Sequence, residues 1–107
     1  MVRQLTAKQL HERLAANGQP LVILDVRQPW EAQICSLAGS TNIPMNDVPH
    51  RVDELDKNAE IVVLCHHGAR SQRVAFYLQT LGFEKLYNLT GGIDAWSKEV
   101  DPTMAKY

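Results

Sequence analysis

Two short apolar runs, at residues 21–26 and 61–64, lack the apolar–polar alternation of a strand that is buried on one face only. Runs of this kind are typical of strands covered on both faces, as in a parallel sheet. Residues 86–89 are a further strand candidate, and a short extended piece at residues 41–43 follows a turn at Gly39. The pattern therefore predicts a small sheet with buried central strands.

A helix is expected over residues 6–17, ahead of the first apolar run. Thr6 can cap its first turn, because a glutamine three residues later completes the capping-box pattern. Leu10 and Leu14 lie one turn apart and are expected to stack on one face. Gly18 is expected to end the helix in the left-handed conformation.

Four further segments have helical features. They are a short helix that begins at Pro29 and carries Trp30, Glu31 and Ile34, residues 47–55, residues 71–81, and a last short helix that carries Trp96. Strands thus alternate with helices, and each connection is long enough for a crossover between parallel strands. We therefore expect one α/β domain over residues 1–107, with a central, mostly parallel sheet flanked by helices on both faces. Only the tail after Asp101 is expected to fray.

Composition narrows the function classes. With 107 residues, 45% of them hydrophobic, the chain is long enough to bury a core without disulfides. Its net charge of -1 gives no electrostatic basis for binding nucleic acid or an anionic membrane. No apolar run approaches the roughly 20 residues of a membrane span, and no signal-peptide pattern follows Met1. A cytoplasmic location is the expectation.

The two cysteines, Cys35 and Cys65, lie thirty positions apart, and neither has partners at zinc-finger spacing. In a reducing compartment a disulfide between them is not expected. His66 and His67 are adjacent in the sequence, and neighbouring side chains rarely converge on one ion. We therefore expect no metal site.

The second apolar run ends at Cys65, and a short loop leads from it into the helix expected over residues 71–81. Backbone N–H groups at a helix N-terminus attract negative charge and lower the pKa of a nearby thiol, and the thiolate is the nucleophilic form. Gly68 permits a tight turn, Arg70 adds permanent positive charge, and Ser71 can cap the helix. The sequence therefore predicts an anion-binding loop around a reactive cysteine. The structural alternative is an inert buried cysteine before an ordinary strand-to-helix turn.

Four segments, in order along the chain, resemble motifs of the single-domain rhodaneses, a family of sulfurtransferases. They are residues 24–31 (LDVRQPWE), 38–44 (AGSTNIP), 65–71 (CHHGARS) and 89–96 (LTGGIDAW). The third segment resembles the active-site loop of that family, and the last resembles its C-terminal motif. The resemblance implies a rhodanese-like fold, a parallel sheet between helices.

The resemblance also implies a chemistry. Cys65 would be the nucleophile and would carry sulfur as a persulfide. The resemblance implies that a ring forms around the outer sulfur from His66, His67, Gly68, Ala69 and Arg70. Ser71 follows this ring as the last residue of the active-site loop. Sulfur would pass from a donor such as thiosulfate to a thiophilic acceptor, cyanide in an assay or a thiol or protein in the cell. This double displacement through a covalent intermediate needs no metal or organic cofactor.

Two places depart from the family pattern. Ser36 and Leu37 stand where family members often have His-Ile ahead of the glycine of the second motif. The loop carries His66 and His67, and histidine is mostly neutral at pH 7, whereas arginine or lysine would hold fixed charge. Whether the two histidines tune substrate charge or merely cap the loop stays open.

Structural roles are the stronger expectation for the remaining residues of interest. Asp25 and Arg27 are expected to tie the first strand to neighbouring loops, with substrate binding as the alternative. Glu31 is a candidate for orienting Arg70. Cys35 is expected to be a partly buried hydrophobe rather than a thiol that resolves the persulfide. The two tryptophans, Trp30 and Trp96, are expected to pack in the core or at its rim. His11 and His50 lie on predicted helices, and no catalytic role is expected for either.

Two other function classes compete with sulfur transfer. Phosphatases and arsenate reductases also cradle an oxyanion beside a cysteine, but their loops place five residues between Cys and Arg. Four residues separate Cys65 from Arg70, and this smaller ring favours sulfur. A non-catalytic module for regulation or protein docking is the other class, and such modules usually lack the cysteine that is present here.

Overall fold

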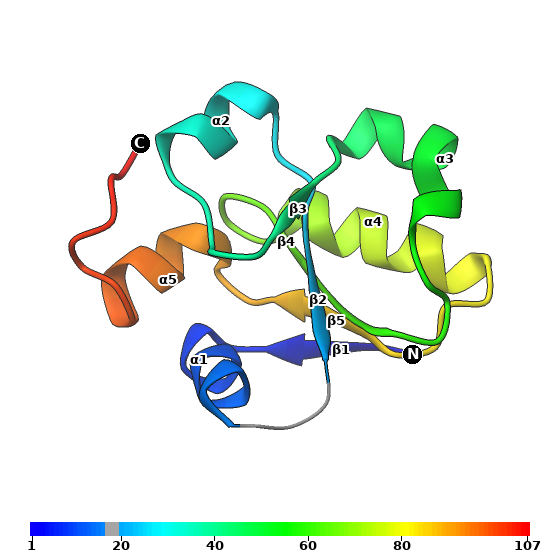
Figure 1. Ribbon diagram of the computed structural model, residues 1–107, viewed down its shortest axis with the longest axis horizontal. Helices are drawn as coiled ribbons and strands as arrows, with labels where there is room; N and C mark the ends of the chain where they lie inside the picture. Colours follow the sequence, from blue (N-terminus) through cyan, green and yellow to red (C-terminus); the bar gives the residue numbers. More distant parts are fainter. Residues whose placement is uncertain (17–19) are drawn as a thin grey trace.

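The computed structural model describes residues 1–16 and 20–107, and a five-stranded sheet forms its centre (Figure 1). The strands are β1 (Val2–Leu5), β2 (Leu21–Asp25), β3 (Thr41–Asn42), β4 (Glu60–Leu64) and β5 (Leu86–Leu89). Neighbouring strands pair in parallel, and their order across the sheet is β1-β5-β4-β2-β3. The predicted α/β class with a parallel sheet is confirmed.

Within the described ranges the helices fall close to the expected segments. They are α1 (Ala7–Ala15), α2 (Pro29–Ile34), α3 (Val48–Arg51), α4 (Ala69–Thr80) and α5 (Gly92–Glu99). None of these helices is long and apolar enough to cross a membrane. The helix expected over residues 47–55 is split, because 3-10 turns at Met45–Asp47 and Val52–Glu54 flank α3. Pro49 lies in the first turn of α3 and accounts for the first break, since a residue without an N–H cannot continue the hydrogen-bond series of the preceding 3-10 turn.

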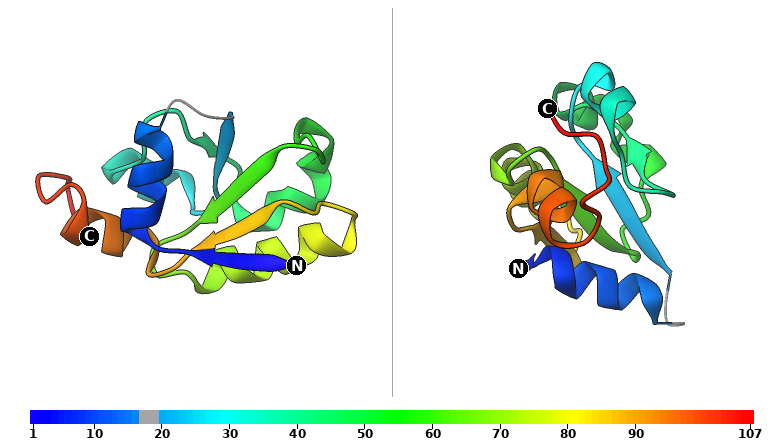
Figure 2. Two further views of the ribbon diagram at one scale, coloured as in Figure 1. Left: turned by 90° about the horizontal axis from the view of Figure 1, so that it is seen from below. Right: turned by 90° about the vertical axis from the view of Figure 1, so that its left-hand side faces the viewer.

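The side chains of β4 alternate between two hydrophobic cores, one on each face of the sheet. Ile61 and Val63 belong to the core that α3 and α4 cover, whereas Val62 and Leu64 belong to the core beneath α1 and α5. Helices therefore cover both faces of the sheet, as expected (Figure 2). This arrangement explains why the run of residues 61–64 is apolar without alternation.

Helix α1 begins with the predicted capping box. The N–H of Gln9 donates to the Thr6 hydroxyl at 3.1 Å, and the N–H of Thr6 donates to the Gln9 side chain at 2.9 Å. Leu10 is fully buried, but Leu14, one turn later in the same helix, is 44% exposed, so only Leu10 belongs to the core. The expected ending at Gly18 lies outside the described residues.

The first strand of the sheet is not marked by the apolar pattern. In β1 only Leu5 is buried, and the strand pairs with β5 alone, at the edge of the sheet. An edge strand with one buried side chain carries neither alternation nor an apolar run. Its position becomes visible only from the pairing with β5.

The tail after Asp101 does not hang free, so the expected fraying is wrong. It returns beside α2, as Figure 1 shows. Its Tyr107 hydroxyl donates to Glu31 at 2.7 Å and accepts from Arg27 at 3.1 Å. The Tyr107 ring also stacks on His66, and this contact places the tail next to the loop that follows β4.

The burial difference within α1 yields a stability prediction. We expect Leu10→Ala to lower the free energy of unfolding by about 3 kcal/mol, because it opens a cavity in the core beneath α1. The matched Leu14→Ala variant should cost about 0.5 kcal/mol or less, since the side chain is half exposed. Urea unfolding followed by circular dichroism measures both values. Equal losses in the two variants would contradict the placement of α1.

Candidate active site

Cys65 follows the carboxyl end of β4 and is 1% exposed. Its side chain shares a core with Ile61 and Val63, on the face that α4 covers. The thiol therefore lies between the end of the central strand and the first turn of α4. Ligands of open α/β sheets gather at this edge, and the predicted placement of Cys65 there is confirmed.

Two backbone N–H groups point at the Cys65 sulfur. The N–H of Gly68 donates to Sγ at 3.0 Å, and the N–H of Ser71 lies 3.4 Å from it. Gly68 reaches this position with a φ of +111°, in the left-handed region that favours glycine, and it is also the N-cap of α4. The turn predicted around Cys65 is thus present, with N–H donors directed at the sulfur, while its binding of an anion stays a prediction.

Ser71 does not cap α4, contrary to expectation, because the helix begins two residues earlier at Ala69. The Ser71 side chain is buried instead and donates to the carbonyl oxygen of the Asn88 side chain. Its hydroxyl oxygen lies 3.4 Å from the Cys65 sulfur. Ser71 and Asn88 therefore form a buried pair of polar side chains next to the thiol. Asn88 was not among the residues that the sequence analysis singled out.

The loop presents further donors. Within the described part of the chain, the N–H groups of His66, His67, Ala69 and Arg70 donate to no other protein group. Ala69 and Arg70 form the first turn of α4, where such free N–H groups carry the positive end of the helix dipole. An anionic atom bound to the Cys65 sulfur would meet these donors.

The first turn of α5 holds the carbonyl groups of the same loop. The N–H of Ile93 donates to the Cys65 carbonyl at 2.9 Å, and the N–H of Asp94 donates to the His66 carbonyl at 3.0 Å. Gly92 has a φ of +61°, and a Cβ there would collide with both carbonyl groups. The carbonyl oxygens are thereby directed to α5, away from the thiol.

Arg70 and Glu31 form a two-pronged ion pair beside the loop. The guanidinium donates to the two carboxylate oxygens at 2.7 and 2.8 Å, and this confirms the expected pairing. The hydrogen bonds from Arg70 and, to a smaller degree, from Tyr107 lower the pKa of Glu31 to about 2, against the opposing effect of burial. The same carboxylate raises the pKa of Arg70. Glu31 therefore stays ionised and fixes the direction of the arginine.

Asp25 and Arg27 form a fully buried ion pair, with Nη2 2.6 Å from Oδ2. Arg27 also donates to the backbone carbonyl of Cys35 at 2.7 Å and to the Tyr107 hydroxyl. It thus ties β2, the segment after α2 and the tail together. The contacts support the expected structural role, in which the pair holds the loops rather than the substrate.

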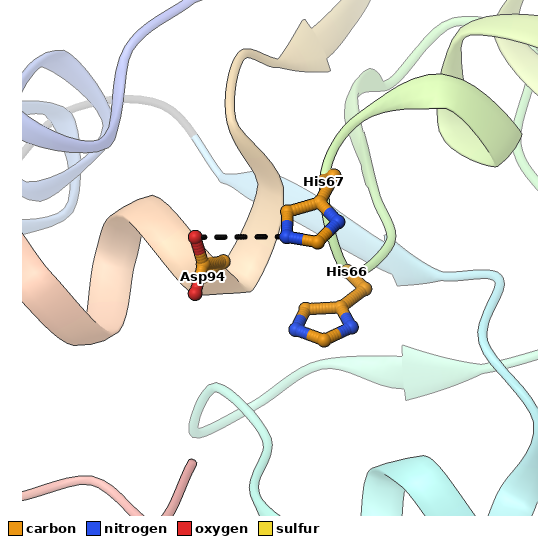
Figure 3. A group of neighbouring side chains, drawn as sticks. All are labelled: His66, His67 and Asp94. Atoms are coloured by element: carbon orange, nitrogen blue, oxygen red, sulfur yellow. Dashed lines mark ion pairs between the residues drawn. The ribbon is translucent and has the colours of Figure 1, made fainter. Parts of the chain in front are cut away.

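The two loop histidines lie face to face. Their ring centroids are 4.2 Å apart with an interplanar angle of 8°, and the His66 ring also stacks on Tyr107 at 4.0 Å. Burial lowers the pKa of His66, so this ring is neutral at pH 7. Figure 3 shows the two rings beside Asp94, with the His67 Nε2 atom 3.7 Å from Oδ2. Asp94 is a site neighbour that the sequence pattern did not single out.

The remaining candidate residues have structural positions. Trp30 is 59% exposed and packs edge-on against Tyr107 at the rim, and Trp96 is buried in the core beneath α5. Cys35 is partly buried and lies 3.9 Å from the Nη1 atom of Arg27. His11 meets the Trp96 ring edge-on, so it belongs to the packing of α1 on α5. Packing roles of the tryptophans are therefore confirmed.

Comparison with known proteins gives this geometry a family. The family model described as rhodanese-like domain matches residues 6–99 of this sequence. The chain belongs to the rhodanese-like family. A sulfurtransferase from Allochromatium vinosum is 32% identical over 105 residues, which cover 98% of this chain and 97% of that protein. The thiosulfate sulfurtransferase GlpE of Tolumonas auensis is 31% identical, over 87% of this chain and 89% of that protein.

One further relative is a longer protein than this chain, and one solved structure is described as a possible phosphatase rather than a sulfurtransferase. The chloroplastic rhodanese-like/PpiC domain-containing protein 12 of Arabidopsis thaliana is 35% identical over 112 residues, and this chain, matched over 99% of its length, spans only 38% of that protein. Among solved structures, a rhodanese-like domain protein from Staphylococcus aureus has a TM-score of 0.84 at 30% identity, over 92% of this chain and 94% of that chain. A Rhodopseudomonas palustris protein described as a possible tyrosine phosphatase has a TM-score of 0.73 at 25% identity, over 91% and 80% of the chains.

The contact between Gly92 and the loop carbonyl groups yields a prediction for the rhodanese-like domain. We expect Gly92→Ala to lower the free energy of unfolding by about 3 kcal/mol, because the new methyl group needs both a left-handed backbone and space that the carbonyl groups occupy. Gly39→Ala is the matched control, since Gly39 has a φ of +79° but no atom within 4 Å of the place that a methyl group would take. The control should cost about 1 kcal/mol. Similar losses in denaturant unfolding would contradict the tight approach at Gly92.

The Glu31 ion pair yields a pH prediction. Because the pKa of Glu31 is about 2 in the folded chain, below its ordinary value of 4.5, its stabilising effect is present at neutral pH. The effect is lost as the pH falls from about 5 towards 2. Glu31→Gln should therefore lower the free energy of unfolding by about 2 kcal/mol at pH 7 and flatten its decline in acid.

Glu54→Gln is the control for this pH prediction. Glu54 pairs with Arg51 through an exposed contact of 2.8 Å on the surface. Since exposed pairs contribute little, the control should keep the acid profile of the parent protein. Urea unfolding at a series of pH values measures each curve, and parallel curves for Glu31→Gln and the parent would overturn the assignment.

Proposed function

We propose that this domain transfers sulfane sulfur from a donor such as thiosulfate to a thiophilic acceptor through a persulfide on Cys65. The observation that carries the proposal is the pair of N–H donors, from Gly68 and Ser71, aimed at the sulfur of a cysteine at the carboxyl end of β4. Donors in this position stabilise a thiolate, which is the attacking form. They are joined by the free N–H groups of the first turn of α4.

In the first step the Cys65 thiolate attacks the outer sulfur of thiosulfate. A new S–S bond forms to Sγ, the sulfur–sulfur bond of thiosulfate breaks, and sulfite leaves with the electron pair. The terminal sulfur of the persulfide then carries the negative charge. The loop N–H groups are the donors that can hold this charge in place of water.

In the second step an acceptor nucleophile attacks the terminal sulfur. The bond between that sulfur and Sγ breaks, and its electron pair returns to Cys65 as the thiolate. Cyanide accepts the sulfur as thiocyanate in an assay, while a thiol or a protein partner is the acceptor in the cell. Oxidation states balance over the cycle, so no cofactor is required.

Arg70 contributes fixed positive charge next to the sulfur, and Glu31 sets its direction from α2. Its charge is already shared with a carboxylate, so the attraction it offers to a bound anion is moderated. The N–H groups are therefore assigned the main share in holding the persulfide. Arg70 is assigned a smaller share, as a positive charge held beside the loop by Glu31.

Phosphoryl chemistry is the competing use of this loop, and one structural neighbour carries a phosphatase description. A phosphoryl group needs donors for three equatorial oxygens, whereas a persulfide presents a single terminal sulfur. The four residues between Cys65 and Arg70 form a short loop, and this spacing favours the single atom. Aryl phosphate hydrolysis should stay near background for the parent protein.

The proposal predicts a covalent intermediate that intact mass spectrometry can detect. Incubation with thiosulfate should add the mass of one sulfur atom to the protein, and cyanide should remove it. Cys65→Ser should lose both the adduct and thiosulfate:cyanide activity, because a serine hydroxyl is not ionised at neutral pH and makes no persulfide. Turnover retained by this variant would show that another group is the nucleophile.

Cys35→Ser is the matched control, since it removes the other thiol at a position between α2 and β3. It should keep the adduct and most of the activity. Circular dichroism of both serine variants checks the fold. Loss of activity in a folded Cys35→Ser variant, or phosphatase turnover without any sulfur adduct in the parent, would overturn the assignment.

A further inference from the structure

A group of three metal-ligating side chains lies beside the sulfur-binding loop. His66 and His67 follow Cys65 directly, and Asp94 comes from the first turn of α5 (Figure 3). One ligand atom from each residue lies within 4.8 Å of the others. This placement revises the sequence argument that adjacent histidines do not converge, because the two rings stack on the same side of the loop.

The three side chains come from segments that are joined by the backbone. The N–H of Asp94 donates to the carbonyl group of His66 at 3.0 Å, so the third ligand is held in register with the first. The His66 ring is further held between His67 and Tyr107. The backbone bond and the stack on Tyr107 limit the movement of His66, whereas the exposed His67 ring is free to turn.

The imidazole nitrogens are not used by the protein. Among the described residues, neither histidine ring makes a hydrogen bond, and the contact of His67 with Asp94 is a longer one of 3.7 Å. Rings with unused nitrogens are suited to an external partner. The positive charge of Arg70 nearby is paired with Glu31, so it opposes a bound cation only weakly.

We propose that His66, His67 and Asp94 form a binding site for a divalent metal ion of the Zn²⁺ class at the entrance to the Cys65 loop. Two imidazoles and one carboxylate are ligands that Zn²⁺ accepts, whereas Mg²⁺ and Ca²⁺ require oxygen ligands. Three protein ligands leave a fourth position open to water or another small ligand.

Binding requires a rearrangement of the site, because the lone pairs of two stacked rings lie in parallel planes and cannot converge on one ion, so the His67 ring must turn out of the stack. Bonds of about 2.0–2.2 Å to a tetrahedral ion bring the ligand atoms closer together than they are here. His67 is exposed and can move, and Asp94 must release Lys98, whose Nζ lies 3.1 Å from Oδ2 in an exposed pair. Because an exposed pair of this kind contributes little, the ion can displace it.

The site also has a consequence that rests on the proposed function. An ion held by the two residues that follow Cys65 narrows the approach to the sulfur. Zn²⁺ should therefore inhibit sulfur loading reversibly, and a chelator should restore it. The metal acts here as a regulator of access rather than as a participant in the reaction.

Isothermal titration with ZnCl₂ tests the site without any sulfur chemistry. The protein is the full chain with Cys35→Ser and Cys65→Ser, so that no thiol can bind the metal. We expect one Zn²⁺ per chain, and adding His67→Ala or Asp94→Asn should weaken binding about tenfold or more. His50→Ala is the control and should bind as the parent does, because His50 is exposed and lies on α3. Absent binding, or affinity unchanged by both ligand variants, overturns the proposal.

A second measurement separates this site from direct binding of zinc to the Cys65 thiolate. Sulfur loading from thiosulfate is followed by intact mass in the presence of increasing ZnCl₂. Asp94→Asn should require about tenfold more zinc for the same inhibition than the chain with native Asp94. Equal inhibition in the two proteins would assign the effect to the thiol and overturn the regulatory role. Failure of sulfur loading without zinc would instead count against the proposed function and leave the titration result standing.

Discussion

The hydrogen bonds from the first turn of α5 to the carbonyl groups of Cys65 and His66 set the shape of the loop that follows β4. A loop of this length has as many carbonyl groups as N–H groups, and a cradle for an anion forms only if the carbonyl groups face elsewhere. Helix α5 supplies two donors that receive them, and Gly92 permits the close approach. The remaining N–H groups are then free for the sulfur of Cys65 or for an anion bound to it.

A second constraint is the sharing of one carboxylate between several segments. Glu31 of α2 accepts from Arg70 of α4 and from Tyr107 of the tail, and Tyr107 in turn accepts from Arg27, next to β2. Each bond ties a separate segment to the same edge of the sheet. The resulting network fixes the arginine of the loop, and it also explains why the tail is ordered beside α2.

The two proposals use different properties of the same loop. Sulfur transfer depends on the backbone N–H groups that face Cys65, whereas metal binding depends on the imidazole nitrogens of the two histidines after it. Histidine side chains carry no permanent charge, unlike arginine or lysine, and an unprotonated imidazole offers a lone pair to a cation. The two proposals together place an anion site next to a cation site in one loop, and their occupancy is expected to be linked by access to the thiol.

The sequence by itself determined the parallel α/β class, the placement of Cys65 at the carboxyl end of a buried strand and the capping of α1, because apolar runs and capping residues are local signals. The pairing of Glu31 with Arg70 was also within its reach, because a carboxylate near the loop is a natural partner for a guanidinium. The tertiary structure alone decided the other features. Edge strand β1 has a single buried side chain, and Asn88, Asp94 and Tyr107 reach the loop from segments distant in the sequence. No local sequence pattern predicts these contacts with the loop, because they depend on the order of the strands in the sheet and on the direction in which each segment leaves the sheet.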